Sequence, residues 1–450
     1  MRDKLQYDLF VKTKPRRLFF KASIPGAIGM LSSALYQTFD GVFVGNFLGS
    51  TAFASVNLAM PFVIINFAVA DLIGVGSAVP ISIALGSGRN EDADRIFTLA
   101  SLMIVISGAI TGSLLYLGAP FLMALMGADG EFLSLAVSYL RLYAIFSPVT
   151  TMMFAADNYL RISGKIRMSM ILNVSLSIFC AIFEFFLLGV MKMSIEGAAF
   201  ANCTGMMLMT FISLVPFFQK KLALNFVKPR FSLSVVKRIV YSGLPSFLNN
   251  IAGRMTSIVM NMMLVRLGGQ DAVSVYGVLM YTDGIIQPIM YGACDSLQPA
   301  IGYNWGAGLY SRVRAVEKYC FLTAFLLCIF GLVIGLFFPG FILSLFISSD
   351  IPSYAPLAVM IFALTYITRW ISFATQSFML AIERSVYATL ISIAMAFVFP
   401  MVFLFILSGF GLTGIWLNFP LTSFFGGMLS VLILLKEKKN IMRKDNPVKL

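Results

Sequence analysis

The stretch IPGAIGMLSSALYQTFDGVFVGNFLG, residues 24–49, decides the fold, and it contains a single charged side chain, Asp40. A membrane-spanning helix needs about 20 mostly apolar residues, and its backbone must satisfy its own hydrogen bonds in lipid. The whole chain shares this character, because 59% of its 450 residues are hydrophobic and 12% are charged, whereas soluble domains have roughly 45–50% apolar residues. The sequence therefore predicts an all-α membrane protein.

Comparable apolar segments recur to the end of the chain. The first follows a basic flank but is long and lacks a small-residue cleavage pattern, so we expect a retained helix rather than a cleaved signal. Hydropathy predicts twelve transmembrane helices near residues 22–45, 53–85, 96–118, 132–155, 168–190, 195–217, 239–265, 274–303, 319–347, 355–380, 386–408 and 412–435.

Lysine and arginine are distributed unevenly between the two sides of the membrane. Of the 33, 28 lie in the N-terminal tail, the even-numbered loops and the C-terminal tail, and only Lys192 and Arg266 lie in the odd-numbered loops. Cytoplasmic loops carry this excess, so we expect a bacterial cytoplasmic (inner) membrane protein with both termini in the cytoplasm. The net charge of +13 then reflects topology, and the expected surroundings are membrane lipids rather than nucleic acid.

The two halves of the chain match at an offset of about 220 residues. The offset pairs Pro25 with Pro245, Gly49 with Gly269, Ala52 with Ala272, Gly86 with Gly306, Gly88 with Gly308, Phe121 with Phe341 and Leu125 with Leu345. Six helices per copy leave both copies in the same orientation, so the two six-helix bundles should be related by a pseudo-two-fold axis along the membrane normal, with a cavity between them.

This duplication sets the expected domain organisation. Each chain holds both lobes, so we expect it to function as a monomer. The predicted parts are a cytoplasmic tail at 1–21, an N-terminal lobe at 22–218, a cytoplasmic linker at 219–238, a C-terminal lobe at 239–435 and a basic tail at 436–450.

The residue types and motifs that the sequence lacks argue against several classes of function. The chain has no histidine, its five cysteines are scattered through apolar stretches, and no GxxxxGK[ST] sequence occurs. We therefore expect no metal, no cofactor, no enzymatic activity and no ATP site. An ion gradient remains as the energy source, and a coupled proton would have to be carried by Asp or Glu.

Charged residues inside the membrane are candidate functional residues, because each costs about 2.5–3.5 kcal/mol at a helix centre. Asp40 is the strongest candidate, since Ser33, Gln37 and Asp40 fall within about 60° on one helix face. A structural role for Asp40, capping or bonding a neighbouring helix, is the alternative. Further cavity candidates are Glu184 and the one-sided set Asp283, Gln287, Asp295 and Gln298, some of which could instead pair with Arg254 or Arg369.

Three stretches carry a family resemblance: residues 24–49, QPAIGYNWGAG at 298–308 and EGAAFAN at 196–202. Together they resemble the multidrug and toxic compound extrusion (MATE) family, in its DinF-like and MepA-like bacterial branch. The resemblance implies two lobes arranged as a V that exchange a drug for protons or sodium, with Asp40 as the helix 1 aspartate and Pro25 as the proline at which that helix bends.

The resemblance also implies a cation site formed by Asp40 with Asn173, Ser177 and Asn202 in the N-terminal lobe. The sequence departs from the family here, because members commonly have aspartate at the position of Ser177 and threonine at that of Asn202. Arg254 stands where the sodium-coupled branch has a glutamate. These departures favour H⁺ over Na⁺ as the coupling ion.

The function expected from the sequence is efflux of organic, drug-like cations by ion-coupled antiport. A flippase for a lipid-linked precursor or metabolite is the alternative, but its cavity would normally hold several cations, and only Arg141, Arg254 and Arg369 lie inside predicted helices. A membrane-embedded enzyme or sensor is a third reading, which the lack of histidine, of a catalytic cysteine context and of a soluble domain disfavours.

Overall fold

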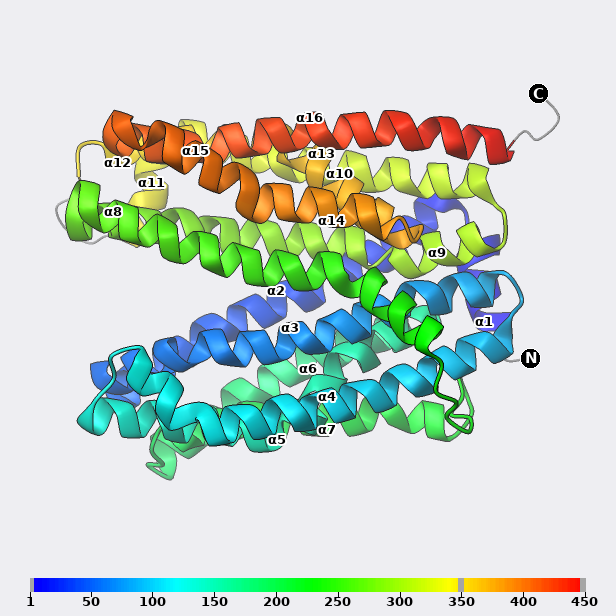
Figure 1. Cartoon of the computed structure of the whole chain (residues 1–450), viewed down its shortest axis with the longest axis horizontal. Helices are drawn as coiled ribbons and strands as arrows, with labels where there is room; N and C mark the ends of the chain where they lie inside the picture. The colour runs from blue at the N-terminus through cyan, green and yellow to red at the C-terminus, as the bar shows by residue number, and fades with distance from the viewer. Residues whose placement is uncertain (1–3, 347–351, 446–450) are drawn as a thin grey trace.

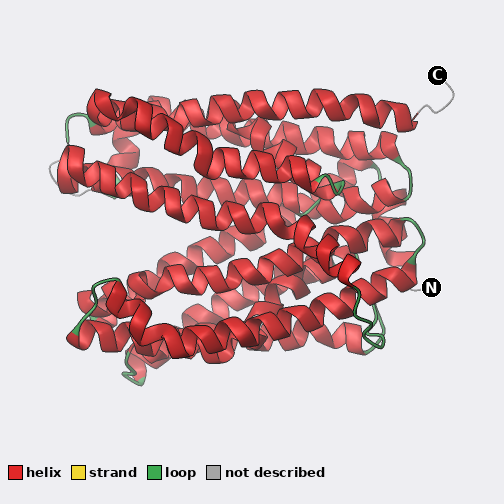
Figure 2. Cartoon of the chain, in the orientation of Figure 1, coloured by secondary structure: helices red, strands yellow, loops and turns green. Residues whose placement is uncertain are grey.

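The computed structural model describes residues 4–346 and 352–445, which are mostly helical with no strand among them (Figure 2). The elements are α1 (Lys4–Tyr7), η1 (Asp8–Lys12), α2 (Pro15–Leu48), α3 (Ser50–Gly86), α4 (Asn90–Leu125), α5 (Gly130–Ile162), α6 (Ile166–Phe185), η2 (Phe186–Val190), α7 (Ile195–Phe218), α8 (Leu233–Asp295), α9 (Gln298–Gly306), α10 (Tyr310–Phe337), α11 (Pro339–Ser344), α12 (Ala355–Ala363), α13 (Tyr366–Ala381), α14 (Ser385–Ile393), η3 (Ala394–Val398), α15 (Phe399–Leu407), η4 (Ser408–Phe410) and α16 (Gly411–Asp445).

Each of the twelve expected segments corresponds to helix in the described part of the chain. Among the described residues, eight helical stretches are long and apolar enough to cross a membrane, or nine when the bent pair α12 and α13 counts as one span. One of the eight, Ser385–Lys438, covers two expected segments across Gly411. α8 is not among the eight, but it covers two further expected segments across its break at Gly269. The all-α membrane fold is confirmed.

The helices form two groups, α2–α7 and α8–α16 (Figure 1). The groups meet near the end that holds both α1 and the last turns of α16, and they diverge toward the opposite end. The contact between groups is made mainly by α8 against α2 and α3, and by α9 against α3. The molecule is therefore closed at the end that carries the termini.

The internal duplication is visible in the backbone. Gly49 ends α2 with φ 89°, and Gly269, 220 residues later, breaks α8 with φ 63°. Both values lie in the left-handed region that glycine adopts without steric cost. Each glycine therefore makes the turn between the first and second long helix of its lobe.

Contacts between the lobes repeat the same offset. A Cβ atom on Gly86 would lie 2.0 Å from the carbonyl oxygen of Tyr303, and one on Gly306 would lie 2.2 Å from that of Ile83. The partners Ile83 and Tyr303 are also 220 residues apart, so the two contacts are equivalent under the pseudo-two-fold axis. Only glycine allows backbones to approach this closely, as small residues do elsewhere between membrane helices.

The N-terminal segment differs from the tail expected at 1–21. Residues 4–12 are helical, and α2 begins at Pro15. The Gln6 side chain donates to the Ile162 carbonyl in the N-terminal lobe (2.6 Å), while Asn304 and Arg312 of the C-terminal lobe donate to the Phe10 carbonyl at 3.1 and 2.8 Å. Phe10 is fully buried. The segment thus ties both lobes together at the closed end.

The ranges predicted as linker and C-terminal tail also contain helix. Residues 219–232 pack against α4, where the backbone amides of Asn225 and Val227 donate to Asp94 (2.8 Å) and Thr98 (3.1 Å). α8 begins at Leu233, inside the range predicted as linker, and α16 continues to Asp445, inside the range predicted as tail. Both helices therefore continue beyond their expected apolar spans.

Candidate cation-coupling site

Asp40 and Glu184 form a buried carboxyl pair between α2 and α6. Asp40 is 5% exposed and Glu184 is 0% exposed, and the two carboxyl groups are close enough to interact electrostatically. The Tyr36 hydroxyl, one turn before Asp40, donates to Glu184 Oε2 at 3.1 Å. Two neighbouring carboxylates repel each other away from water, and a proton on one of them removes the repulsion, so the pair is suited to hold a proton.

The pair lacks a compensating cation. No Lys or Arg among the described residues forms an ion pair with Asp40 or Glu184, and Asp40 Oδ1 and Glu184 Oε1 are buried without a hydrogen-bond partner there. The Tyr139 hydroxyl is also buried and unpartnered. Unsatisfied buried oxygens of this kind are costly and mark a site that can accept a positive charge.

Asn173 and Ser177 lie on the same helix as Glu184 but nearer the closed end. Asn173 Nδ2 donates to Asp157 Oδ1 at 2.8 Å, and Ser177 donates to the Asn173 carbonyl at 3.1 Å. Eleven residues separate Asn173 from Glu184, which is about 16 Å along a helix. The structure therefore places Asn173 in a second cluster rather than beside Asp40.

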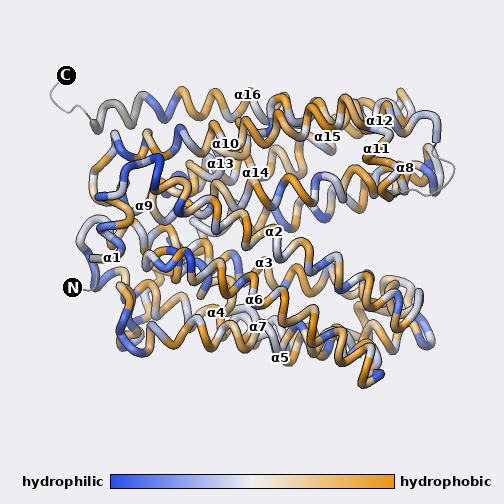
Figure 3. Tube along the Cα trace, turned by 180° about the vertical axis from the view of Figure 1, so that it is seen from behind, coloured by the Kyte–Doolittle hydropathy of each residue, from blue (hydrophilic) through white to orange (hydrophobic). Residues whose placement is uncertain are grey.

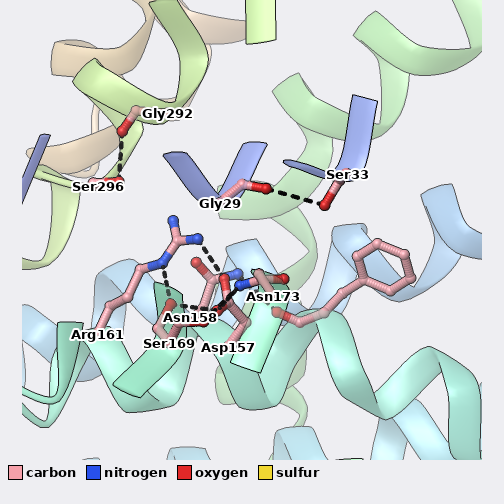
Figure 4. A network of polar contacts seen from close by, with 10 residues as sticks. Gly29, Ser33, Asp157, Asn158, Arg161, Ser169, Asn173, Gly292 and Ser296 are labelled. Atoms are coloured by element: carbon pink, nitrogen blue, oxygen red, sulfur yellow. Dashed lines mark hydrogen bonds and ion pairs between the residues drawn. The ribbon is translucent and has the colours of Figure 1, made fainter. Parts of the chain in front are cut away.

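The second cluster is centred on Asp157, which the sequence analysis missed (Figure 4). Arg161 Nη2 lies 2.5 Å from Asp157 Oδ2, Arg161 Nε donates to Ser169 Oγ at 3.1 Å, and Ser169 donates to Asp157. The predicted helix ended at residue 155, so both charges fell outside it. The i, i+4 spacing of acid and base was the signal that could have found this pair.

The remaining N-terminal candidates lie in different surroundings. Gln37 is exposed, although Asp40 three residues later is buried, and Asn202 is half-buried on α7. Pro25 is buried inside α2, where its neighbour Ser23 donates to the Ala293 carbonyl across the lobe interface at 2.7 Å. Pro25 is thus at the point where α2 contacts the other lobe.

In the C-terminal lobe, Asp283 is neutralised by a cation. Arg369 donates to both of its oxygens, at 2.8 and 3.0 Å, and the Tyr366 hydroxyl donates to Oδ1 at 3.1 Å. This bidentate geometry is the strong form of the Arg–carboxylate pair. Of the two pairing arginines considered from the sequence, Arg369 is the partner, and Arg254 is exposed on α8.

Asp295 and Gln298 lie near the lobe interface. Ser377 and Gln298 donate to Asp295 Oδ1 at 2.6 and 2.8 Å. Arg161 of the N-terminal lobe is close enough to interact electrostatically with Asp295, and it extends from α5 toward the side of Ser296 (Figure 4). Gln287 is half-buried and lies apart from this group. The four helix-side candidates therefore separate into distinct environments.

The family comparison finds the same duplication as the sequence, at the same offset. The MatE family model matches residues 25–186 and again residues 245–406, two copies at an offset of 220. This chain belongs to the MatE family. It is a multi-pass membrane transporter, and the duplicated family unit covers the helices that carry the Asp40–Glu184 pair and the Asp283–Arg369 pair.

Relatives within and around the MatE family are similar over nearly the full chain. The multidrug export protein MepA of Staphylococcus saprophyticus is 26% identical over 428 residues, covering 92% of each chain. Among solved structures, a MATE transporter in complex with MaL6 superposes with a TM-score of 0.90 at 20% identity, covering 98% of this chain and 99% of that one. An outward-facing MATE family transporter of the MOP superfamily gives 0.87 at 20% identity, covering 97% and 98%.

Proposed function

We propose that this MatE transporter exports organic cations and other lipophilic compounds by antiport with protons, using the Asp40–Glu184 pair as the coupling site. The observation that carries the proposal is the contrast between the lobes. The N-terminal lobe buries two carboxyl groups that form no ion pair with any described residue, whereas the C-terminal lobe neutralises Asp283 with Arg369. The first arrangement can take up a proton without leaving a buried arginine unpaired, whereas protonation of Asp283 would leave Arg369 without its counter-charge.

The mechanism follows from competition between a proton and a cationic substrate. When Asp40 or Glu184 loses the shared proton, the buried pair carries excess negative charge, which favours a cation near the N-terminal lobe. Reprotonation removes that attraction and releases the substrate. A substrate that bound both states equally would shift nothing, so coupling requires that it prefers the deprotonated state.

Protons are favoured over sodium as the coupling ion. Sodium sites require several oxygen ligands directed at one point, and Asn173, the amide expected from the sequence to contribute, lies about 16 Å along α6 from Glu184. One charge moving through about 100 mV supplies about 2.3 kcal/mol, so a single proton per cycle provides a useful driving force.

We place the closed end of the molecule in the cytoplasm of a bacterial inner membrane. Hydrophilic residues concentrate at the end that carries both termini, with hydrophobic helices beyond it (Figure 3). The excess of basic residues on that side supports this orientation. The lobes diverge at the other end, which faces the outside in this orientation.

A flippase for a pyrophosphate-linked cargo would need cationic side chains to bind the cargo, and the membrane-spanning helices offer few. Arg369 is bound to Asp283, and Arg141 donates to the Tyr116 carbonyl at 3.2 Å with its guanidinium 5.0 Å from the Tyr116 ring. Arg254 remains as an exposed intramembrane arginine. A pyrophosphate-linked cargo would need more than one such group, so the cationic cargo is preferred.

The test is ethidium efflux from proteoliposomes with proton and sodium gradients imposed separately. We expect efflux driven by the proton gradient in the wild type, and its loss in Asp40→Asn and Glu184→Gln. Asp129→Asn and Glu131→Gln remove the same charges from exposed positions and should leave efflux unchanged. Efflux that survives both pair variants would refute the coupling site, and absence of ethidium efflux under either gradient would favour the flippase.

A further inference from the structure

A basic pocket opens on the side of the molecule between α2 and α6, away from the carboxyl pair. It has a volume of about 670 Å³ at the closed end of the lobes. Five cationic side chains line it: Lys14, Arg16, Arg17, Lys21 and Arg167. The proposed transport cycle uses none of them, so their concentration at one place needs a separate explanation.

These five cations carry no ion pair with any described residue. Other basic residues at the same end are paired: Arg238 with Glu383, Arg384 with Glu437, and Lys12 with Asp8 at 2.8 Å. Asp8 lies in an adjoining pocket that shares Lys14 and Arg17, but its charge is balanced by Lys12. The pocket therefore has a net positive charge with no internal counter-charge, and it is complementary to an anion.

An exposed apolar stripe leads away from the cations along α2. Phe20, Ile24 and Ile28 also line the pocket and are 47%, 52% and 43% exposed. Their spacing of four residues places them on one helix face, over about 12 Å. A soluble anion would gain nothing from this stripe, whereas a lipid would place its acyl chain on it.

We propose that this pocket binds an anionic phospholipid. The phosphate groups lie among Arg16, Arg17, Lys21 and Arg167, and an acyl chain packs along Phe20, Ile24 and Ile28. Basic pockets between transmembrane helices on the cytoplasmic side suit acidic headgroups, and guanidinium groups bind phosphate with paired hydrogen bonds. The pocket also includes Pro25, so the lipid contacts α2 at its proline. This proposal rests on the membrane location and on the proposed orientation, and not on the proposed antiport.

The experiment measures lipid binding to the purified full-length protein by native mass spectrometry. Phosphatidylglycerol, cardiolipin and phosphatidylcholine of matched acyl chains are titrated separately. We expect the anionic lipids to bind at least tenfold more tightly than phosphatidylcholine. R16Q/R17Q/R167Q should weaken anionic binding at least tenfold, while K220Q/K221Q/K228Q, which removes three exposed linker cations, should leave it unchanged.

Two further arms separate a lipid from a free phosphate. F20A/I24A should weaken binding of the long-chain anionic lipid several-fold, and millimolar inorganic phosphate or pyrophosphate should fail to displace it. Equal binding of phosphatidylcholine, unchanged binding in the arginine triple variant, or displacement by inorganic phosphate would each overturn the proposal. None of these readouts depends on transport. Failure of the lipid proposal would therefore not affect the proposed coupling site, and failure of the coupling site would not affect the lipid proposal.

Discussion

The Asp283–Arg369 pair provides the most quantitative prediction. Its two hydrogen bonds of 2.8 and 3.0 Å join side chains that are 11% and 18% exposed, in a helix bundle within the membrane. Removing one partner of a buried pair leaves an uncompensated charge, which costs about 3–5 kcal/mol. Arg369→Gln should therefore destabilise the protein by about 3 kcal/mol, while Asp283→Asn/Arg369→Gln should recover most of that loss.

The assay is thermal unfolding of purified protein in one detergent, followed by circular dichroism, with Arg141→Gln as the control. Arg141 also lies within a long helix, but it contacts only an uncharged carbonyl and a ring among its described partners, so its loss should matter little. The double variant should also retain proton-driven efflux, because the pair's role is structural. Equal stability of Arg369→Gln and wild type, or a double variant no better than the single one, would refute this reasoning.

Two other predictions concern the closed end. Gly86→Ala introduces a Cβ atom that would lie 2.0 Å from the Tyr303 carbonyl oxygen, so the lobes must separate by more than 1 Å at this contact. The distance between spin labels at positions 129 and 409 should therefore shift. Gly253→Ala, whose Cβ atom meets nothing within 4 Å, should leave that distance unchanged. Phe10→Ala removes a fully buried ring and should lower the free energy of unfolding by about 3 kcal/mol, which a lower melting temperature would show. The control is Tyr7→Ala, at a 45% exposed site. Equal melting temperatures of the two variants would contradict the bridging role of the N-terminal segment.

The helical framework could be predicted because its signals are local. Apolar segments of spanning length identify the helices, and repeated glycines identify the duplication. Gly49 and Gly269 both have positive φ, and Gly86 and Gly306 make equivalent contacts, so each aligned glycine has a backbone reason for being there. Such requirements act on single positions and are therefore visible in one sequence.

The candidate site was less predictable because its partners are distant in the sequence. Asp40 could be singled out as a charge in an apolar helix, but its pairing with Glu184 depends on how α2 packs against α6. Glu184 was therefore only one of several further cavity candidates, although its side chain is fully buried. Asp283 was another, because nothing in the sequence decided whether Arg254 or Arg369 reached it.

The ends of helices were the other source of error. Asp157 lies two residues beyond the predicted span, yet α5 continues to Ile162. Polar residues at the end of a helix lower the local hydropathy without ending the helix, since the backbone hydrogen bonds continue. The same effect hid the helical residues before Pro15 and those at the start of α8.

The most direct test of the central claim is proton release on substrate binding. Ethidium is added to detergent-purified protein in weakly buffered solution, and a pH-sensitive dye records the protons released per ethidium bound. The shared-site account predicts about one proton released by the wild type and by Asp129→Asn, and none by Asp40→Asn or Glu184→Gln. Ethidium binding without proton release in the wild type, or with unchanged release in both pair variants, would contradict it.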